Sequence, residues 1–197
     1  MNYSVTTPII LASASPRRSS LLAQVGIPFE VEVSGVPEDS SDDLSPSELA
    51  RSLALSKANA VASRQEESGR IVLGADSIVV VDGIVFGKPR SRSDARHMLE
   101  TILGRKHQVI TGIALVESGT GRQYESHEET EVTMRAATED EIRQYLATGE
   151  SMDKAGAYGA QGFGAGFIER VNGCFYNVVG LPLSLVTTSL RTFMGAS

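Results

Sequence analysis

The feature that most constrains the fold is a near-continuous apolar run, Ile71-Val72-Leu73-Gly74-Ala75, followed at once by Asp76. A run of this kind is typical of a strand that is covered on both faces. The pattern predicts a central strand over residues 71–75, with the carboxylate of Asp76 at its carboxyl end. Open α/β sheets gather ligands and catalytic groups at that end, although a simple turn formed by Asp76 and Ser77 is an equally weighted interpretation.

Helix starts are marked by hydroxyl residues at N-cap positions. Ser15 precedes Pro16, while Ser45 and Thr138 each have a glutamate three residues later, which is the pattern of a capping box. The helices predicted in this way run from Pro16 to Gly26, from Ser45 to near Gly69 and from Thr138 to Gly149, with two more over Ser93 to Leu103 and after Pro182.

Strand signals fill the intervals between these helices. They are a short apolar run at residues 9–12, an Asp-Gly hairpin over residues 78–86, two alternating segments at 107–117 and 123–134, and a hairpin turn at Asn172-Gly173. Because helices and strands alternate throughout, the expected class is α/β with a mixed sheet flanked by helices. A length of 197 residues predicts a single domain over residues 1–197.

Composition narrows the choice of partners and compartment. A formal net charge of −6 repels polyanions, so a nucleic acid polymer is not an expected partner. The single cysteine, Cys174, cannot form an intramolecular disulfide, which fits a reducing compartment. No apolar run approaches the roughly 18 residues of a membrane span, and no signal peptide is evident. The chain is therefore expected to be soluble and cytoplasmic, without a membrane partner.

The first candidate site is the segment Ser13-Ala14-Ser15-Pro16-Arg17-Arg18. It places small hydroxyl residues at a strand end and two arginines in the first turn of a helix. Backbone N–H groups, the helix dipole and a guanidinium would together favour a phosphate there. An ordinary N-cap followed by two solvated arginines has about even weight.

Further charged residues are candidates for the same chemistry. Lysine binds phosphate as a point charge, and a second carboxylate beside Asp76 would complete a site for a hard metal ion. Glu38, Lys57 and Lys88 lie on loops or element edges from which they could reach one groove, yet each alone is more often a solvated surface residue.

The glycine-rich stretch from Gly156 to Gly166 would let the backbone approach a ligand closely, with Gln161 hydrogen-bonding a base edge. It has no Gly-Lys-Ser/Thr and is not a phosphate-binding loop. A mobile surface loop carries about half the weight. The three histidines and Cys174 lack ligand spacing and are interpreted as structural or surface residues.

Taken in order, these blocks resemble the Maf family of nucleoside triphosphate pyrophosphatases over nearly the whole chain. The resemblance rests on six segments: Leu11 to Arg18, Gly74-Ala75-Asp76-Ser77, Gly87-Lys88-Pro89, His107 to Gly112, Asp153 to Gly159, and Val178 to Leu183. It implies an elongated mixed sheet with two lobes and a deep central cleft, of the Maf and ITPase-like kind, often in a homodimer.

The resemblance also implies an activity and a set of site residues. The activity is metal-dependent cleavage of nucleoside triphosphates, with dTTP and UTP as the expected substrates, to the monophosphate and pyrophosphate. Asp76 matches the proton acceptor, and Ser13 belongs with the substrate-binding residues. Arg17, Lys57, Lys88, Glu38 and Gln161 match other cleft residues. The mechanistic hypothesis places one or two Mg²⁺ or Mn²⁺ ions on Glu38 and Asp76, with the base read by Arg17, Ser77 and Gln161.

One position departs from the family pattern, because Ser77 stands where the family usually has threonine. The hydroxyl is kept and the methyl is lost, so the pyrimidine preference is expected to hold but to relax, with CTP or modified pyrimidine nucleotides also used. Two alternatives stay open. One is a nucleotide-binding regulator of cell division or septum formation, and the other is a hydrolase of an unrelated phosphoester or a damaged nucleotide.

Overall fold

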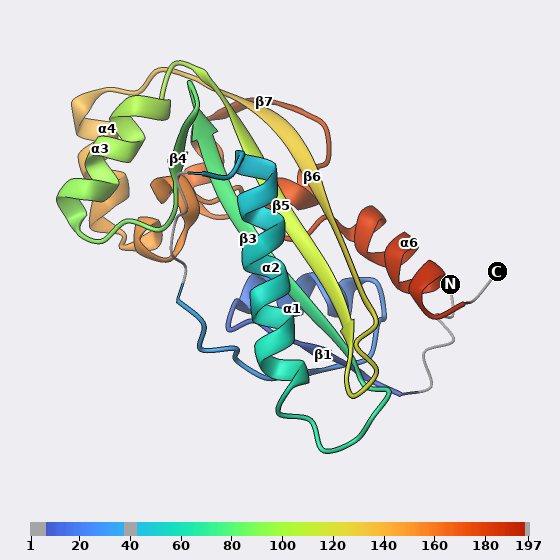
Figure 1. The fold of residues 1–197 in the computed structure, drawn as a ribbon. Helices are drawn as coiled ribbons and strands as arrows, with labels where there is room; N and C mark the ends of the chain where they lie inside the picture. The colour runs from blue at the N-terminus through green and yellow to red at the C-terminus, as the bar shows by residue number, and fades with distance from the viewer. Residues whose placement is uncertain (1–6, 38–42, 196–197) are drawn as a thin grey trace. The chain divides into compact units, whose positions relative to one another are not determined.

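The computed structural model describes residues 7–37 and 43–195 (Figure 1). The helices are α1 (Pro16–Gln24), α2 (Pro46–Ala62), α3 (Arg92–Ile102), α4 (Glu139–Ala147), α5 (Phe175–Val179) and α6 (Leu183–Phe193). The strands are β1 (Ile9–Leu11), β2 (Phe29–Val31), β3 (Ile71–Val81), β4 (Ile84–Phe86), β5 (Lys106–Glu117), β6 (Gln123–Met134) and β7 (Ile168–Asn172). Three short 3₁₀ helices follow α4: η1 (Glu150–Asp153), η2 (Ala155–Ala157) and η3 (Phe163–Phe167).

The strands form one seven-stranded sheet in the order β2-β1-β3-β5-β6-β7, with β4 paired to β3. β1 runs parallel to both β2 and β3, whereas β4 is antiparallel to β3 and β7 is antiparallel to β6. The predicted α/β class with a mixed sheet is therefore confirmed. Contacts divide the chain into two compact units, the first of residues 1–76, 111–128 and 180–197, and the second of residues 77–110 and 129–179. The single domain over residues 1–197 stays a prediction.

In the first unit, α2 lies against β1, β3 and β5. Its small residues Ala54, Ala58 and Val61 pack on apolar side chains of the three strands and are fully buried. A Cβ on Gly74 would stand 2.1 Å from the carbonyl oxygen of Ala54, and one on Gly112 would stand 2.2 Å from that of Ala50. The helix therefore rests on the sheet at backbone contact, and only glycine permits this approach.

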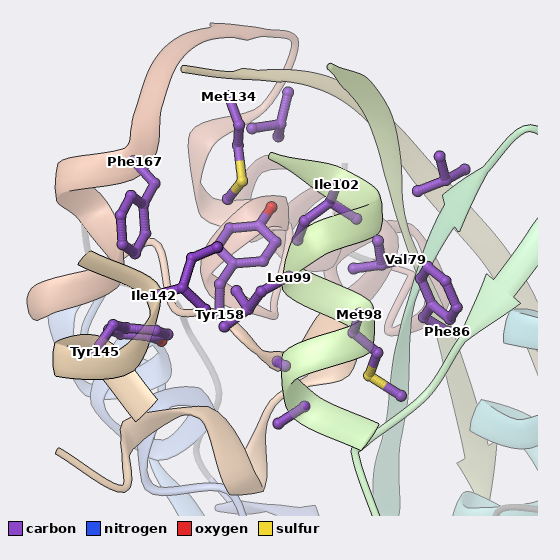
Figure 2. Close-up of a cluster of buried hydrophobic side chains, with 14 of the residues drawn as sticks. Val79, Phe86, Met98, Leu99, Ile102, Met134, Ile142, Tyr145, Tyr158 and Phe167 are labelled. Atoms are coloured by element: carbon purple, nitrogen blue, oxygen red, sulfur yellow. The ribbon is translucent and has the colours of Figure 1, made fainter. Parts of the chain in front are cut away.

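The second unit has its own apolar core (Figure 2). One face of α3 contributes Met98, Leu99 and Ile102, and α4 contributes Ile142 and Tyr145. These side chains pack with residues of the strands, of the glycine-rich segment and of η3. The labelled ones are Val79, Phe86, Met134, Tyr158 and Phe167.

Several local predictions are confirmed by the backbone. Both capping boxes form, Ser45 with Glu48 and Thr138 with Glu141. Pro16 occupies the start of α1, and Gly26 follows that helix with φ +71°. The Asp-Gly hairpin also forms, with positive φ at Asp82 and Gly83. Ser15 is the N-cap of α1, although its side chain makes no capping hydrogen bond.

Three predictions were wrong. Strand β3 does not end before Asp76 but continues to Val81, because the apolar residues after Ser77 extend the same strand into its pairing with β4. Helix α2 ends at Ala62 rather than near Gly69, since the polar stretch from Ser63 offers no apolar face to bury. Asn172-Gly173 is not a hairpin turn, because β7 leads directly into α5.

Candidate functional site

Asp76 meets Lys57 in the first unit as a consequence of how α2 rests on β3. Alternation along a strand puts Gly74 and Asp76 on the same face of β3, and Gly74 touches the backbone of α2 at Ala54 and Ala58. Lys57 precedes Ala58, and its Nζ lies 2.5 Å from Oδ1 of Asp76. Both side chains are 7% exposed, so the pair is buried and strongly directional.

The connection from β1 to α1 is tied to the same strand by Arg18. Its Nη1 donates to Ser13 Oγ at 3.2 Å and to the carbonyl oxygen of Ala75 at 2.8 Å, while its Nε donates to the carbonyl oxygen of Gly180 at 2.9 Å. Arg18 is 9% exposed. The sequence presented the two arginines as equivalent, but their environments differ in the structure. Arg18 is buried and hydrogen-bonds to three oxygen atoms, one of them the carbonyl oxygen of the residue before Asp76, whereas Arg17 is half-buried in the first turn of α1.

The other predicted site residues lie elsewhere in the chain. Ser77 is half-buried in β3, Lys88 is exposed after β4, and Gln161 is exposed in the glycine-rich segment, all three in the second unit. Within the first unit, Ser13, Lys57 and Asp76 are all buried: Lys57 pairs with Asp76, and Arg18 links Ser13 to the carbonyl oxygen of Ala75, the residue before Asp76. Glu38 lies outside the described residues.

The first residues of the glycine-rich segment are buried within the second unit. Gly156 N donates to the carbonyl oxygen of Gly87 at 3.1 Å, and a Cβ on Gly156 would stand 2.9 Å from Val79. Tyr158 is 5% exposed, and its hydroxyl lies 2.7 Å from Nε2 of His107. Burial lowers the pKa of His107 from 6.5 to about 4 and raises that of Tyr158, so both groups are neutral near pH 7.

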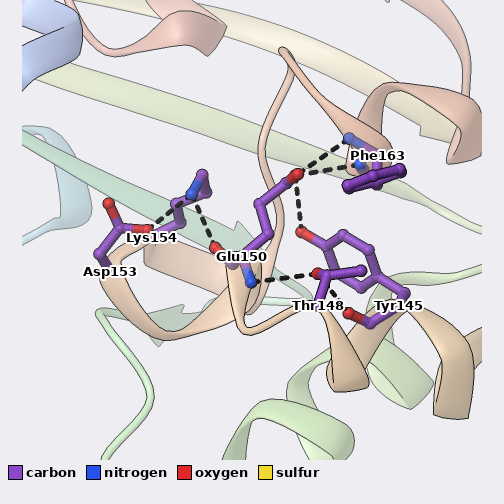
Figure 3. Close-up of polar contacts among 7 residues, drawn as sticks. Tyr145, Thr148, Glu150, Asp153, Lys154 and Phe163 are labelled. Atoms are coloured by element: carbon purple, nitrogen blue, oxygen red, sulfur yellow. Dashed lines mark hydrogen bonds and ion pairs between the residues drawn. The ribbon is translucent and has the colours of Figure 1, made fainter.

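Sequence reasoning missed Glu150, which organises the polar contacts of this segment (Figure 3). Its carboxylate accepts hydrogen bonds from the backbone N–H groups of Phe163 and Gly164 and from the Tyr145 hydroxyl. In the sequence, Glu150 directly follows the helix stop predicted at Gly149, where an acidic residue carries no distinctive signal. Its role therefore becomes visible only in three dimensions.

A surface hollow of about 340 Å³ in the second unit is lined by Arg92, Ser93, Arg96, Arg143, Leu146 and Ala147. Its arginines do not form an isolated cationic patch. Arg96 pairs with Glu100 and Glu139, and Arg143 pairs with Asp140. These carboxylates offset the charge of Arg96 and Arg143, which weakens the attraction of the hollow for an anion.

Within residues 7–37 and 43–195, no group of three or more His, Cys, Asp or Glu side chains is arranged to hold a metal ion. In the same ranges, none of the helices combines the length and the apolar character needed to cross a membrane. Among the buried residues of the first unit described above, Asp76 carries a carboxylate, and its Oδ1 accepts from Lys57.

Comparison with solved structures defines the fold. The chain resembles the Staphylococcus aureus Ham1 protein with a TM-score of 0.51 and 14% identity, covering 94% of this chain and 99% of that one. This likeness concerns the architecture alone and places the chain among α/β proteins of that fold.

Sequence comparison is more specific. Residues 8–193 match the family described as Maf-like protein. The chain is 52% identical over 185 residues to the dTTP/UTP pyrophosphatase of Symbiobacterium thermophilum, covering 94% of this chain and 93% of that protein. It is 45% identical over 186 residues to that of Desulforamulus reducens (94% and 96% covered) and 47% identical over 189 residues to that of Bacillus cytotoxicus (95% and 97% covered). This chain belongs to the Maf family.

Proposed function

We propose that this protein is a nucleoside triphosphate pyrophosphatase that hydrolyses dTTP and UTP to the monophosphate and pyrophosphate. The observation that carries the proposal is the buried contact between Asp76 and Lys57, in a chain that is 45–52% identical to proteins named dTTP/UTP pyrophosphatase. Asp76 is 5% exposed and is held in one direction by the ammonium group of Lys57, which would place a general base where it could take a proton from water.

In the proposed reaction, Asp76 takes a proton from a water molecule while the oxygen of that water bonds to the α phosphorus. The bond from that phosphorus to the bridging oxygen breaks, and pyrophosphate leaves with the bond electrons. Lys57 donates to Oδ1 and fixes the direction of the Asp76 carboxylate. Arg17 and Lys88 offset the charge of the triphosphate, and the Ser13 hydroxyl contributes to its binding.

A divalent cation, Mg²⁺ or Mn²⁺, fits the donor chemistry at Asp76. Such ions are commonly held by one or two carboxylates together with phosphate oxygens of the substrate, so a dedicated cluster of protein ligands is not required. Glu38 is the second predicted carboxylate. When bound, the ion would neutralise part of the triphosphate charge.

Base selection is assigned to Arg17, Ser77 and Gln161. The side-chain amide of Gln161 offers a donor and an acceptor, which matches the imide edge of thymine or uracil. Its exposure leaves the amide accessible to a nucleotide. With serine at position 77, a preference for dTTP and UTP that extends to CTP is expected.

The test is turnover of purified protein on a nucleotide panel with Mg²⁺ or Mn²⁺, with the products of dTTP separated by chromatography. We expect dTMP and pyrophosphate, and rates lower by about 100-fold or more in Asp76→Asn and Lys88→Ala. Asp140→Asn and Lys106→Ala are matched controls, because both side chains lie at the surface of the second unit in exposed ion pairs.

Each alternative has its own outcome. Wild-type activity in both Asp76→Asn and Lys88→Ala would refute the roles assigned to these residues. dTDP with orthophosphate would show cleavage at the γ phosphate. Nucleotide binding without pyrophosphate release would favour a regulator over an enzyme.

A further inference from the structure

The carboxylate of Glu150 occupies the centre of the glycine-rich segment (Figure 3). Oε2 accepts from the backbone N–H of Phe163 at 2.8 Å, and Oε1 accepts from that of Gly164 at 3.0 Å. Oε1 also accepts from the hydroxyl of Tyr145 at 3.1 Å. One side chain thus binds two consecutive peptide groups of the segment and anchors them to α4. Hydrogen bonds to a charged acceptor are among the stronger ones in a protein.

The surrounding glycines lie so close to Glu150 and its neighbours that a side chain would not fit. Gly162 has φ +80°, and a Cβ there would stand 2.5 Å from Oε2 of Glu150. At Gly164 a Cβ would stand 2.7 Å from the carbonyl oxygen of Gly159 and 3.0 Å from the Tyr145 hydroxyl. At Gly162 and Gly164 the segment therefore lies against Glu150 and Tyr145 without room for side chains.

A second restraint acts on the other side of Gln161. Lys154 Nζ donates to the carbonyl oxygen of Glu150 at 2.6 Å and to Oδ1 of Asp153 at 2.6 Å. The stem of Lys154 lies under Gly159, where a Cβ would stand 2.7 Å from its Cε. Gln161 is exposed between these two fixed points. The residues on either side of Gln161 are restrained while its side chain is exposed, an arrangement suited to presenting an amide to a ligand.

We propose that Glu150 is a positioning residue for pyrimidine specificity: it fixes the backbone on which Gln161 is presented to the base. This inference rests on the proposed function, in which Gln161 reads the imide edge. Glu150 itself does not touch the nucleotide and acts through Gln161. Tyr145 supports it by holding Oε1 from the side of α4.

The variant Glu150→Gln keeps the size of the side chain but turns an acceptor oxygen into an NH₂ group that faces a backbone donor. The segment should loosen around residues 161–164. We expect KM for dTTP and UTP to rise about tenfold, with kcat changed much less, and the preference for dTTP over a purine triphosphate to fall by a similar factor. If Glu150→Gln folds poorly, Tyr145→Phe removes only the hydroxyl and should shift the same parameters more weakly.

Glu141→Gln is the matched control. Glu141 also accepts a backbone N–H, that of Thr138, and also lies in the second unit, but it is linked to the glycine-rich segment through Arg135 at Gly166 rather than at residues 162–164. An equal rise in KM in Glu141→Gln would assign the effect to stability and overturn the proposal. A double-mutant cycle tests whether the effect of Glu150 depends on the side chain of Gln161. In a Gln161→Ala background, Glu150→Gln should change the dTTP preference little. An undiminished effect there would also overturn it.

Hydrogen exchange of the protein without nucleotide separates this inference from the proposed function. Faster exchange at the amides of Phe163 and Gly164 in Glu150→Gln is expected. Unchanged exchange would show that Glu150 does not restrain this backbone and would overturn the inference. A wild-type protein that does not hydrolyse dTTP or UTP would instead overturn the proposed function, and with it the role in specificity, whatever the exchange shows.

Discussion

Lys57 and Asp76 illustrate why a buried ion pair is costly to disturb. Two charges removed from water lose hydration free energy, and their mutual attraction compensates for this loss only at close range with good geometry. Here Nζ and Oδ1 are 2.5 Å apart and both side chains are almost covered. Removing one partner leaves the other buried without its counter-charge, so the pair affects the stability of the fold as well as the proposed chemistry.

A double-mutant cycle on this pair is the first prediction at the scale of residues. Lys57→Met and Asp76→Asn should each lower the free energy of unfolding by about 3 kcal/mol, because each leaves an uncompensated buried charge or an unmatched donor. The double variant should lose clearly less than the sum of the two. Urea denaturation followed by circular dichroism measures all three values. Additive losses would show that the two charges are not coupled.

His107 carries a prediction of pH dependence. Its pKa of about 4 lies below the unfolded value near 6.5, so the unfolded chain binds more protons between these two limits. Stability should therefore fall as the pH drops, by about 2 kcal/mol from this group between pH 7 and pH 5.

Urea denaturation at the two pH values measures this loss, which His107→Gln should reduce. The exposed His97 provides the control, because His97→Gln should keep the full pH dependence. The carboxylates of Glu48 and Glu141 have lowered pKa values, so their contributions are lost below the pH 5–7 window. An unaltered pH dependence in His107→Gln would contradict the assignment.

At the scale of elements, the contact of α2 with the sheet explains which parts of the site the sequence could predict. The apolar run at residues 71–75 and the capping box at Ser45 predicted β3 and the start of α2 from local chemistry. The meeting of Lys57 with Asp76 depends on Gly74 and Gly112, whose missing side chains let the helix backbone reach the strands. A glycine in a strand indicates that another part of the chain packs closely there, but it does not identify which part. The pairing of Lys57 with Asp76 could therefore not be predicted from the local sequence.

Gly74→Ala tests that approach. Its Cβ would overlap the carbonyl oxygen of Ala54, a backbone atom that cannot rotate away, so α2 must shift. We expect a loss of about 3 kcal/mol in the free energy of unfolding, and lower turnover of dTTP because Lys57 moves with the helix. The control is Gly166→Ala, since a Cβ at Gly166 would meet nothing within 4 Å. Equal stability and turnover in the two variants would contradict the close approach.

For the whole molecule, the distribution of the site residues along the chain explains the limits of prediction. The motifs around Ser13, Asp76 and Lys88 were visible because their residue types suit phosphate chemistry. Arg18 was predicted only as one of two equivalent arginines, and Glu150 was assigned no role, because each acts through backbone groups distant in the sequence, such as Gly180 for Arg18 and Gly164 for Glu150. Backbone carbonyl and amide groups are present at every residue, so sequence alone does not indicate which of them a side chain will bind.

Net charge is a property of the whole molecule and gives the last prediction. A chain of net charge −6 should bind a small nucleotide through local cations while repelling a long polyanion, whose affinity depends on many phosphate contacts. We expect no binding of labelled oligothymidine in fluorescence anisotropy at low salt, where such contacts are strongest, and no inhibition of dTTP hydrolysis by the oligomer. Tight, salt-sensitive binding would show that the cations form a continuous track for a polymer, contrary to a site built for the free nucleotide.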